Sequence, residues 1–180
     1  MIFQLGDFTL DIDVEQTGAF YNRVDVPNAS EQCDCIDCRN FEQAILEVPD
    51  TILDFFSSLG IDPRKPTEVY NVIGDLEESS TVWYNGWYHV CGMIIKGPET
   101  NVNSNDTGNI DYLWENSFAP EPSFPFYVLP MQKDDLLHID FPKPVIQLEI
   151  DIRLSYVLSQ PYVREVRPVI LPNPSDNTQE

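Results

Sequence analysis

The chain has 180 residues, 42% of them hydrophobic, and its 30 acidic and 10 basic residues give a formal net charge of −20. Such a field repels nucleic-acid phosphates and anionic lipid headgroups and attracts cations, so we expect no nucleic acid and no membrane as direct partner, whereas a basic protein would suit it. No apolar run reaches the roughly 18 residues that a membrane-spanning helix needs, and no signal peptide is recognisable. We therefore expect a cytoplasmic globular protein whose cysteines are reduced.

The first element that the sequence predicts is a half-buried strand over residues 8–14. Apolar and polar residues alternate there, which puts Phe8, Leu10, Ile12 and Val14 on one face. Residues 17–30 have mixed polarity, with a glycine and a proline, and are expected to form a loop or a short irregular strand.

Two consecutive short helices are predicted between residues 35 and 59. We expect Asp34 or Asp37 to cap the first, because both are favourable N-cap residue types. Its buried face is expected to carry Cys38, Phe41, Ile45 and Val48. The second helix has its apolar stripe at Ile52, Phe55, Phe56 and Leu59, and Gly60 supplies the left-handed turn that ends it.

A β-hairpin is predicted around Asn85 and Gly86, after a short strand over residues 67–73. Asn-Gly between apolar residues is the strongest short hairpin signal, because both central positions of the turn need positive φ. The predicted tip gathers four aromatic side chains, which we take as candidate partner-binding anchors: Trp83, Tyr84, Trp87 and Tyr88. The alternative interpretation is that these aromatics pack in the core.

The rest of the chain predicts more extended structure. Residues 100–109 read as a loop and residues 114–130, which are rich in proline and aromatics, as an extended packed connection. Residues 136–141 alternate as a strand would, with His138 and Asp140 on one face, and residues 145–158 form the longest expected strand. The sum is an α+β fold: a mostly antiparallel sheet of five to seven strands with the two helices near residues 35–59. We expect one domain over residues 1–167 and a flexible tail over residues 168–180.

A cysteine cluster is the most distinctive feature of the sequence. Cys33, Cys35 and Cys38 fall within six residues at the start of the first predicted helix. Zinc in structural sites prefers four thiolate or imidazole ligands, and a turn that enters a helix can bring three such sulfurs together. Cys91 or His89, two residues apart on a strand, is the candidate fourth ligand, so we expect a site that fastens the helix start to the hairpin.

Two other interpretations of the cysteines stay open. Reduced cysteine is a small apolar side chain, so the cluster can be ordinary core without metal. Cys35 and Cys38 also form a C-x-x-C pair at a helix N-terminus, where thiolates are stabilised, although the flanking Asp34 and Asp37 oppose redox chemistry.

Three functions follow from these features. The first is a non-enzymatic, acidic, protein-binding domain of the inhibitor or immunity type, directed at a basic protein and held together by a structural cysteine–zinc site. The second is a zinc-dependent enzyme with an open coordination position at Cys33, Cys35 and Cys38. The third is a small globular domain with a reduced cysteine core and no metal. No serine-hydrolase, HExxH, phosphate-loop or dinucleotide-binding motif is present, which favours the first.

Overall fold

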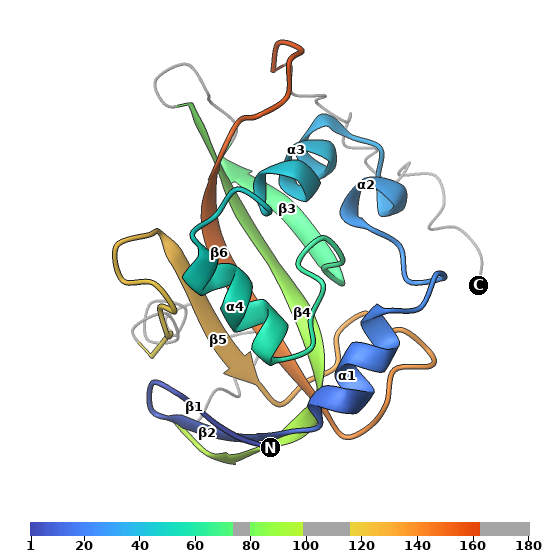
Figure 1. Ribbon diagram of the computed structural model, residues 1–180, viewed down its shortest axis with the longest axis vertical. Coiled ribbons are helices and arrows are strands. Elements are labelled where there is room, and N and C mark those ends of the chain that lie inside the picture. Colours follow the sequence, from blue (N-terminus) through green and yellow to red (C-terminus); the bar gives the residue numbers. More distant parts are fainter. Residues whose placement is uncertain (74–79, 99–115, 163–180) are drawn as a thin grey trace, which may run out of the picture.

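The computed structural model describes residues 1–73, 80–98 and 116–162 (Figure 1). Over these residues the chain forms four helices and an open, six-stranded antiparallel sheet, which confirms the α+β prediction. The helices are α1 (Val14–Tyr21), α2 (Ala29–Gln32), α3 (Ile36–Ala44) and α4 (Asp50–Ser58). The strands are β1 (Ile2–Leu5), β2 (Phe8–Ile12), β3 (Glu68–Ile73), β4 (Thr81–Lys96), β5 (Phe126–Met131) and β6 (Val145–Ser155).

Strand β4 is the central strand of the sheet and pairs with three other strands. The strand order is β1-β2-β4-β6-β5, and β3 also pairs with β4. The edge of β4 opposite β6 is shared, because β3 pairs with its first half and β2 with its last residues. Helix α1 covers the interval between those two strands: the Tyr21 hydroxyl donates to the His89 carbonyl at 3.0 Å, and the Cys91 N–H donates to Thr17 Oγ1 at 3.0 Å.

The predicted hairpin is wrong, because Asn85 and Gly86 lie inside the continuous strand β4. Among the described glycines, positive φ occurs at Gly6 and Gly60 and not at Gly86. Gly86 faces Val69 across the β3–β4 pairing, and a Cβ there would lie 2.9 Å from the Val69 Cα. The glycine therefore allows two backbones to approach closely. Its sequence signal is the same as that of a turn.

The two predicted helices are confirmed, and the strand predicted over residues 145–158 forms as β6, although β4 with 16 residues is longer than β6 with 11. Helices α3 and α4 fall within residues 35–59, and Gly60 ends α4 with φ of +77°. The inward residues of β6 are at most 1% exposed: Ile146, Leu148, Ile150, Ile152 and Leu154. Strand β3 forms where residues 67–73 predicted it, and the proline-containing β5 is an edge strand.

Besides α2, which was not predicted, three segments differ from the sequence prediction. Helix α1 replaces the end of the first predicted strand and part of the predicted loop, because the Asp13 carboxylate caps it by accepting the Gln16 N–H at 3.0 Å. The short β1 was not predicted. Residues 136–141 form turns rather than a strand, with Leu136 at φ of 53°, and Leu136 and Ile139 are exposed. Alternation there does not reflect burial.

The helices cover one face of the sheet (Figure 1). Aromatic side chains of α3 and α4 meet those of β4 in the core, where Phe41 lies 5.3 Å from Tyr84 and Phe56 lies 5.1 Å from Tyr88 between ring centroids. Within the described ranges no helix has both the length and the apolar character needed to cross a bilayer. The predicted loop over residues 100–109 and the tail over residues 168–180 lie outside the described residues.

Candidate metal centre

The three clustered cysteines are brought together by a tight connection between two helices. Helix α2 ends with Cys33 as its C-cap, whose N–H donates to the Ala29 carbonyl at 3.2 Å. Helix α3 begins with Cys35 as its N-cap, which replaces the expected Asp34 or Asp37. Cys38, in the first turn of α3, lies close to the other two sulfurs.

Glu42 fixes the two helices against each other. Its carboxylate, one helical turn beyond Cys38, accepts the Asn28 side-chain amide at 3.1 Å and the Ser30 backbone N–H at 3.2 Å. It also accepts the Ser30 hydroxyl. The Ser30 bond satisfies a backbone N–H in the first turn of α2, and the three bonds together hold that helix, with Cys33 at its end, against α3. The sequence carries no signal for Glu42, because its partners belong to a helix that was not predicted.

The three sulfurs, which we call the thiol cluster, all lie within 4.8 Å of one another. Zinc bound tetrahedrally at about 2.3 Å from each sulfur holds its ligands about 3.8 Å apart, so small side-chain movements would enclose an ion. Cys33 and Cys35 are half-buried and Cys38 is 6% exposed. The Cys35 sulfur already accepts the Cys38 backbone N–H at 3.4 Å. The residues present fit a soft or borderline metal ion.

The surroundings of Cys38 oppose the ionisation of its thiol. Burial, followed by hydrogen bonding and charge repulsion from Cys35 and Cys33, raises the pKa of the Cys38 thiol well above its ordinary value. Three thiolates at this spacing repel one another unless a cation lies between them. A bound metal ion reverses the effect, because coordinating thiols lose their protons.

The thiol cluster is connected to the sheet through α3. The Asp37 carbonyl accepts the Tyr84 hydroxyl at 3.0 Å, and the Asp37 carboxylate accepts the Tyr162 hydroxyl at 2.9 Å. Asn40, which is fully buried, donates to the Ser155 carbonyl at 3.1 Å and accepts the Val157 N–H at 2.8 Å. An ion that fixed the first turn of α3 would therefore also steady the end of β6.

His89, an expected fourth ligand, lies outside the thiol cluster. It is 1% exposed, with Nδ1 2.9 Å from Thr67 Oγ1 and Nε2 3.2 Å from Gln147 Oε1. Because the Gln147 oxygen can only accept, Nε2 carries the hydrogen and Nδ1 is free to accept from Thr67. Burial lowers the pKa of His89 below its ordinary value. Both ring nitrogens are satisfied, so this is a structural histidine.

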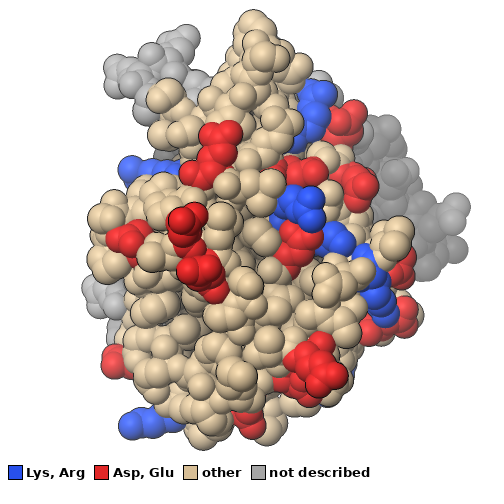
Figure 2. Space-filling model, in the orientation of Figure 1, with Lys and Arg blue, Asp and Glu red and all other residues tan. Residues whose placement is uncertain are grey.

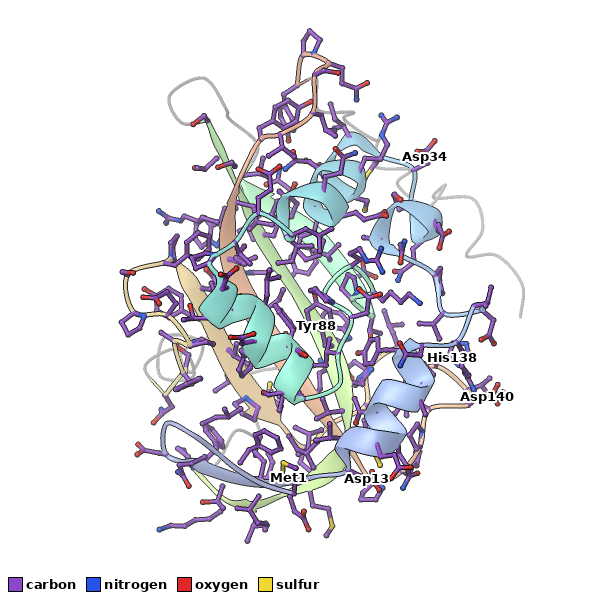
Figure 3. All side chains as sticks on the ribbon, viewed as in Figure 1. Met1, Asp13, Asp34, Tyr88, His138 and Asp140 are labelled. Carbon is purple, nitrogen blue, oxygen red and sulfur yellow. The ribbon has the colours of Figure 1, made fainter. Side chains whose placement is uncertain are left out.

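Cys91, the other expected ligand, also lies outside the thiol cluster. Its carbonyl accepts the Asp13 N–H at 2.8 Å, and it borders a cleft of about 440 Å³ between β2, the start of α1 and β4. Figure 3 shows Asp13, beside Cys91, at one end of the molecule and Asp34, beside Cys33 and Cys35 in sequence, at the other. The predicted convergence of Cys91 or His89 on the cysteine triplet is therefore not what the structure has.

The four candidate partner-binding aromatics divide between the two faces of β4. Tyr84 and Tyr88 are fully buried beneath the helices, so they cannot contact a partner in the folded protein. Trp83 and Trp87 are half-buried on the opposite face, where Trp83 Nε1 donates to Asp151 at 2.7 Å. A continuous strand separates neighbouring side chains in this way, whereas the expected hairpin would have gathered them at its tip.

No model of a known protein family matches the chain, and neither the curated proteins nor the solved structures contain a significant match to it.

Proposed function

We propose that this protein is a non-enzymatic, cytoplasmic, protein-binding domain that holds a structural zinc ion at Cys33, Cys35 and Cys38 and binds a basic partner protein. The observation that carries the metal is the approach of three thiols to within 4.8 Å. Zinc is the ion of choice because it tolerates thiolate ligands, has no redox chemistry of its own and is usual in structural sites. Among the described residues three ligands lie together, and we propose water or another molecule as the fourth.

The basic partner is inferred from the charge of the chain. A net charge of −20 attracts basic surfaces over several ångströms and accelerates encounter with them. Figure 2 shows acidic side chains distributed over the helix-covered face in several separate groups. An inhibitor or immunity-type protein that neutralises a basic protein would use this charge, and its binding would weaken as salt concentration rises.

Zinc analysis combined with thiol titration tests the proposal. Protein purified without a histidine tag, in reducing buffer, is expected to contain about one zinc per chain and to expose four further reactive thiols after denaturation with a chelator, three from the cluster and one from the buried Cys91. If the chain contained no zinc, even after incubation with equimolar zinc and dialysis, the proposal would fail and the cluster would be a reduced cysteine core without metal.

A zinc-dependent enzyme is the second candidate, favoured by the half-exposed Cys33 and Cys35 and by the three-ligand donor set. Chelation separates the two. A structural ion contributes directly to folding, so its removal is expected to lower the melting temperature by about 10 °C or more. Loss of zinc with an unchanged melting temperature would favour the enzyme.

A further inference from the structure

The sheet face turned away from the helices carries one continuous row of side chains. In the strand register Tyr70 pairs with Asn85, Asn85 with Asp151, and Asp151 with Tyr127, so four strands each contribute one residue to the row. We call these four residues the tyrosine row. Its two ends are open to solvent, with Tyr70 49% and Tyr127 44% exposed.

Asp151 is held in place at the centre of the row. Its Oδ2 accepts Trp83 Nε1 at 2.7 Å and Asn85 Nδ2 at 2.9 Å. A carboxylate has about four acceptor sites, and both of these bonds use the same oxygen. The carboxylate therefore keeps its orientation and retains capacity to accept from a ligand.

The same face already binds the chain's own cations. The Arg153 guanidinium lies over the Trp83 ring, 5.1 Å from its centroid, and Lys133 Nζ lies 2.8 Å from the Glu149 carboxylate. Aromatic rings and carboxylates at this spacing stabilise guanidinium and ammonium groups. The chemistry of the face is therefore that of a receptor for lysine and arginine side chains.

We propose that the tyrosine row is the docking surface for an extended lysine- or arginine-bearing segment of a basic partner protein; this inference rests on the proposed protein-binding function. Adjacent strands are about 4.8 Å apart, so the two tyrosines lie about 14 Å apart across three intervals. Alternate residues of an extended segment are about 6.8 Å apart, so cations at positions i and i+4 would match the two tyrosines. Asp151 lies two strand intervals from Tyr70, so the cation at i+2 would be offset from it by about 3 Å, which a long side chain can span.

A peptide titration tests this docking surface. The probe is a fluorescent peptide with the sequence Arg-Ser-Arg-Ser-Arg, and the matched probe is Arg-Arg-Arg-Ser-Ser, which has the same charge. Asp151→Asn, which keeps the shape of the side chain, is expected to weaken the alternating peptide at least about fivefold. Asp54→Asn on the helix-covered face makes the same charge change and is expected to alter affinity less than twofold.

Two further variants test the docking surface even if Asp151→Asn fails to fold, and they are expected to change peptide affinity in opposite directions. Tyr127→Ala, at an exposed edge position, is expected to weaken binding about threefold. Arg153→Gln frees the Trp83 ring and is expected to tighten binding about threefold. Lys96→Gln removes the same positive charge elsewhere and is expected to have a smaller effect.

The failures are distinguishable. If the wild-type protein binds both peptides, and Asp151→Asn and Asp54→Asn weaken them equally, the tyrosine row is not the docking surface, although attraction to basic partners remains. If neither peptide binds at low salt, the proposed function fails as well. If maltohexaose shifts the amide resonances of the row and the peptides do not, the row is a carbohydrate site and the inference is overturned.

Discussion

The thiol cluster and the group around His89 both contain residues that were expected to bind metal. They are nevertheless built in opposite ways. The thiol cluster gathers three sulfurs from six consecutive residues, and the described chain supplies no fourth ligand to it. His89 instead meets Thr67 and Gln147, which are 22 and 58 residues away, and they satisfy both of its ring nitrogens.

The difference separates a structural polar group from a candidate site. A buried polar side chain with all of its hydrogen bonds made needs no ligand and gains nothing from one. The three thiols lie within 4.8 Å of one another, and their mutual repulsion as thiolates is relieved by a cation. The close approach of several ligands, rather than residue type alone, therefore marks the candidate metal centre.

The largest effect is expected from removing one thiol. Cys38→Ser should weaken zinc binding by more than about 100-fold, because even residues that only orient metal ligands are worth about 10–100-fold. Competition with a chromophoric chelator measures the change. Cys91→Ser is the matched control and should leave zinc affinity unchanged; if instead it abolished binding, the fourth ligand would be Cys91.

The hydrogen bond between His89 and Thr67 depends on the close approach of β3 to the backbone of β4. Gly86→Ala should cost about 2–3 kcal/mol of unfolding free energy, because a Cβ would meet Val69 and displace β3, which leads from Thr67. Denaturant unfolding measures this. Gly18→Ala is the control: its new Cβ would meet no atom closer than 3.8 Å, and alanine favours the helix, so it should stabilise by up to about 1 kcal/mol. Equal effects would count against close approach at Gly86.

Substitution of Glu42 tests whether the contact between α2 and α3 holds the thiol cluster together. Glu42→Ala releases α2 and should lower zinc affinity about tenfold, while the three thiols remain. Glu47→Ala removes the same charge from an exposed position beyond α3 and should change affinity less than twofold. If the two variants behave alike, Glu42 acts only through its charge.

The smallest effect concerns the protonation of His89. Its pKa is lowered in the folded state by burial, so below about pH 6.5 the unfolded chain binds more protons than the folded one. Stability is then complete above that pH and falls as pH decreases, by up to about 1.4 kcal/mol per pH unit. Unfolding of the wild type and of His89→Gln between pH 7.5 and 5.5 measures it. A decline of equal size in both would assign the effect to other groups.

Local patterns predicted those parts of the fold in which burial follows the chain. The alternation of β6 and the apolar stripes of α3 and α4 were sufficient, because each element packs one regular face against the core. The thiol cluster was predictable for the same reason, since its ligands lie within one turn of the chain. The hairpin predicted at Asn85 and Gly86 was wrong, because a glycine required by a neighbouring strand has the same sequence signal as one required by a turn.

Contacts between distant segments could not be predicted. The partners of His89 depend on the register of β3 and β6 against β4, and the tyrosine row depends on the register of four strands. No local signal aligned Tyr70 and Tyr127 with Asp151. Helix α1 was missed because its capping residue, Asp13, continues the alternation of β2.

X-ray absorption at the zinc edge of the purified protein tests the central claim most directly, because it counts the sulfur atoms around the ion. Three thiolates with an external fourth ligand predict three sulfurs at about 2.3 Å and one nitrogen or oxygen at about 2.0–2.1 Å. Four sulfurs would contradict the external fourth ligand, and an ion bound only by nitrogen and oxygen would contradict a metal centre formed by Cys33, Cys35 and Cys38.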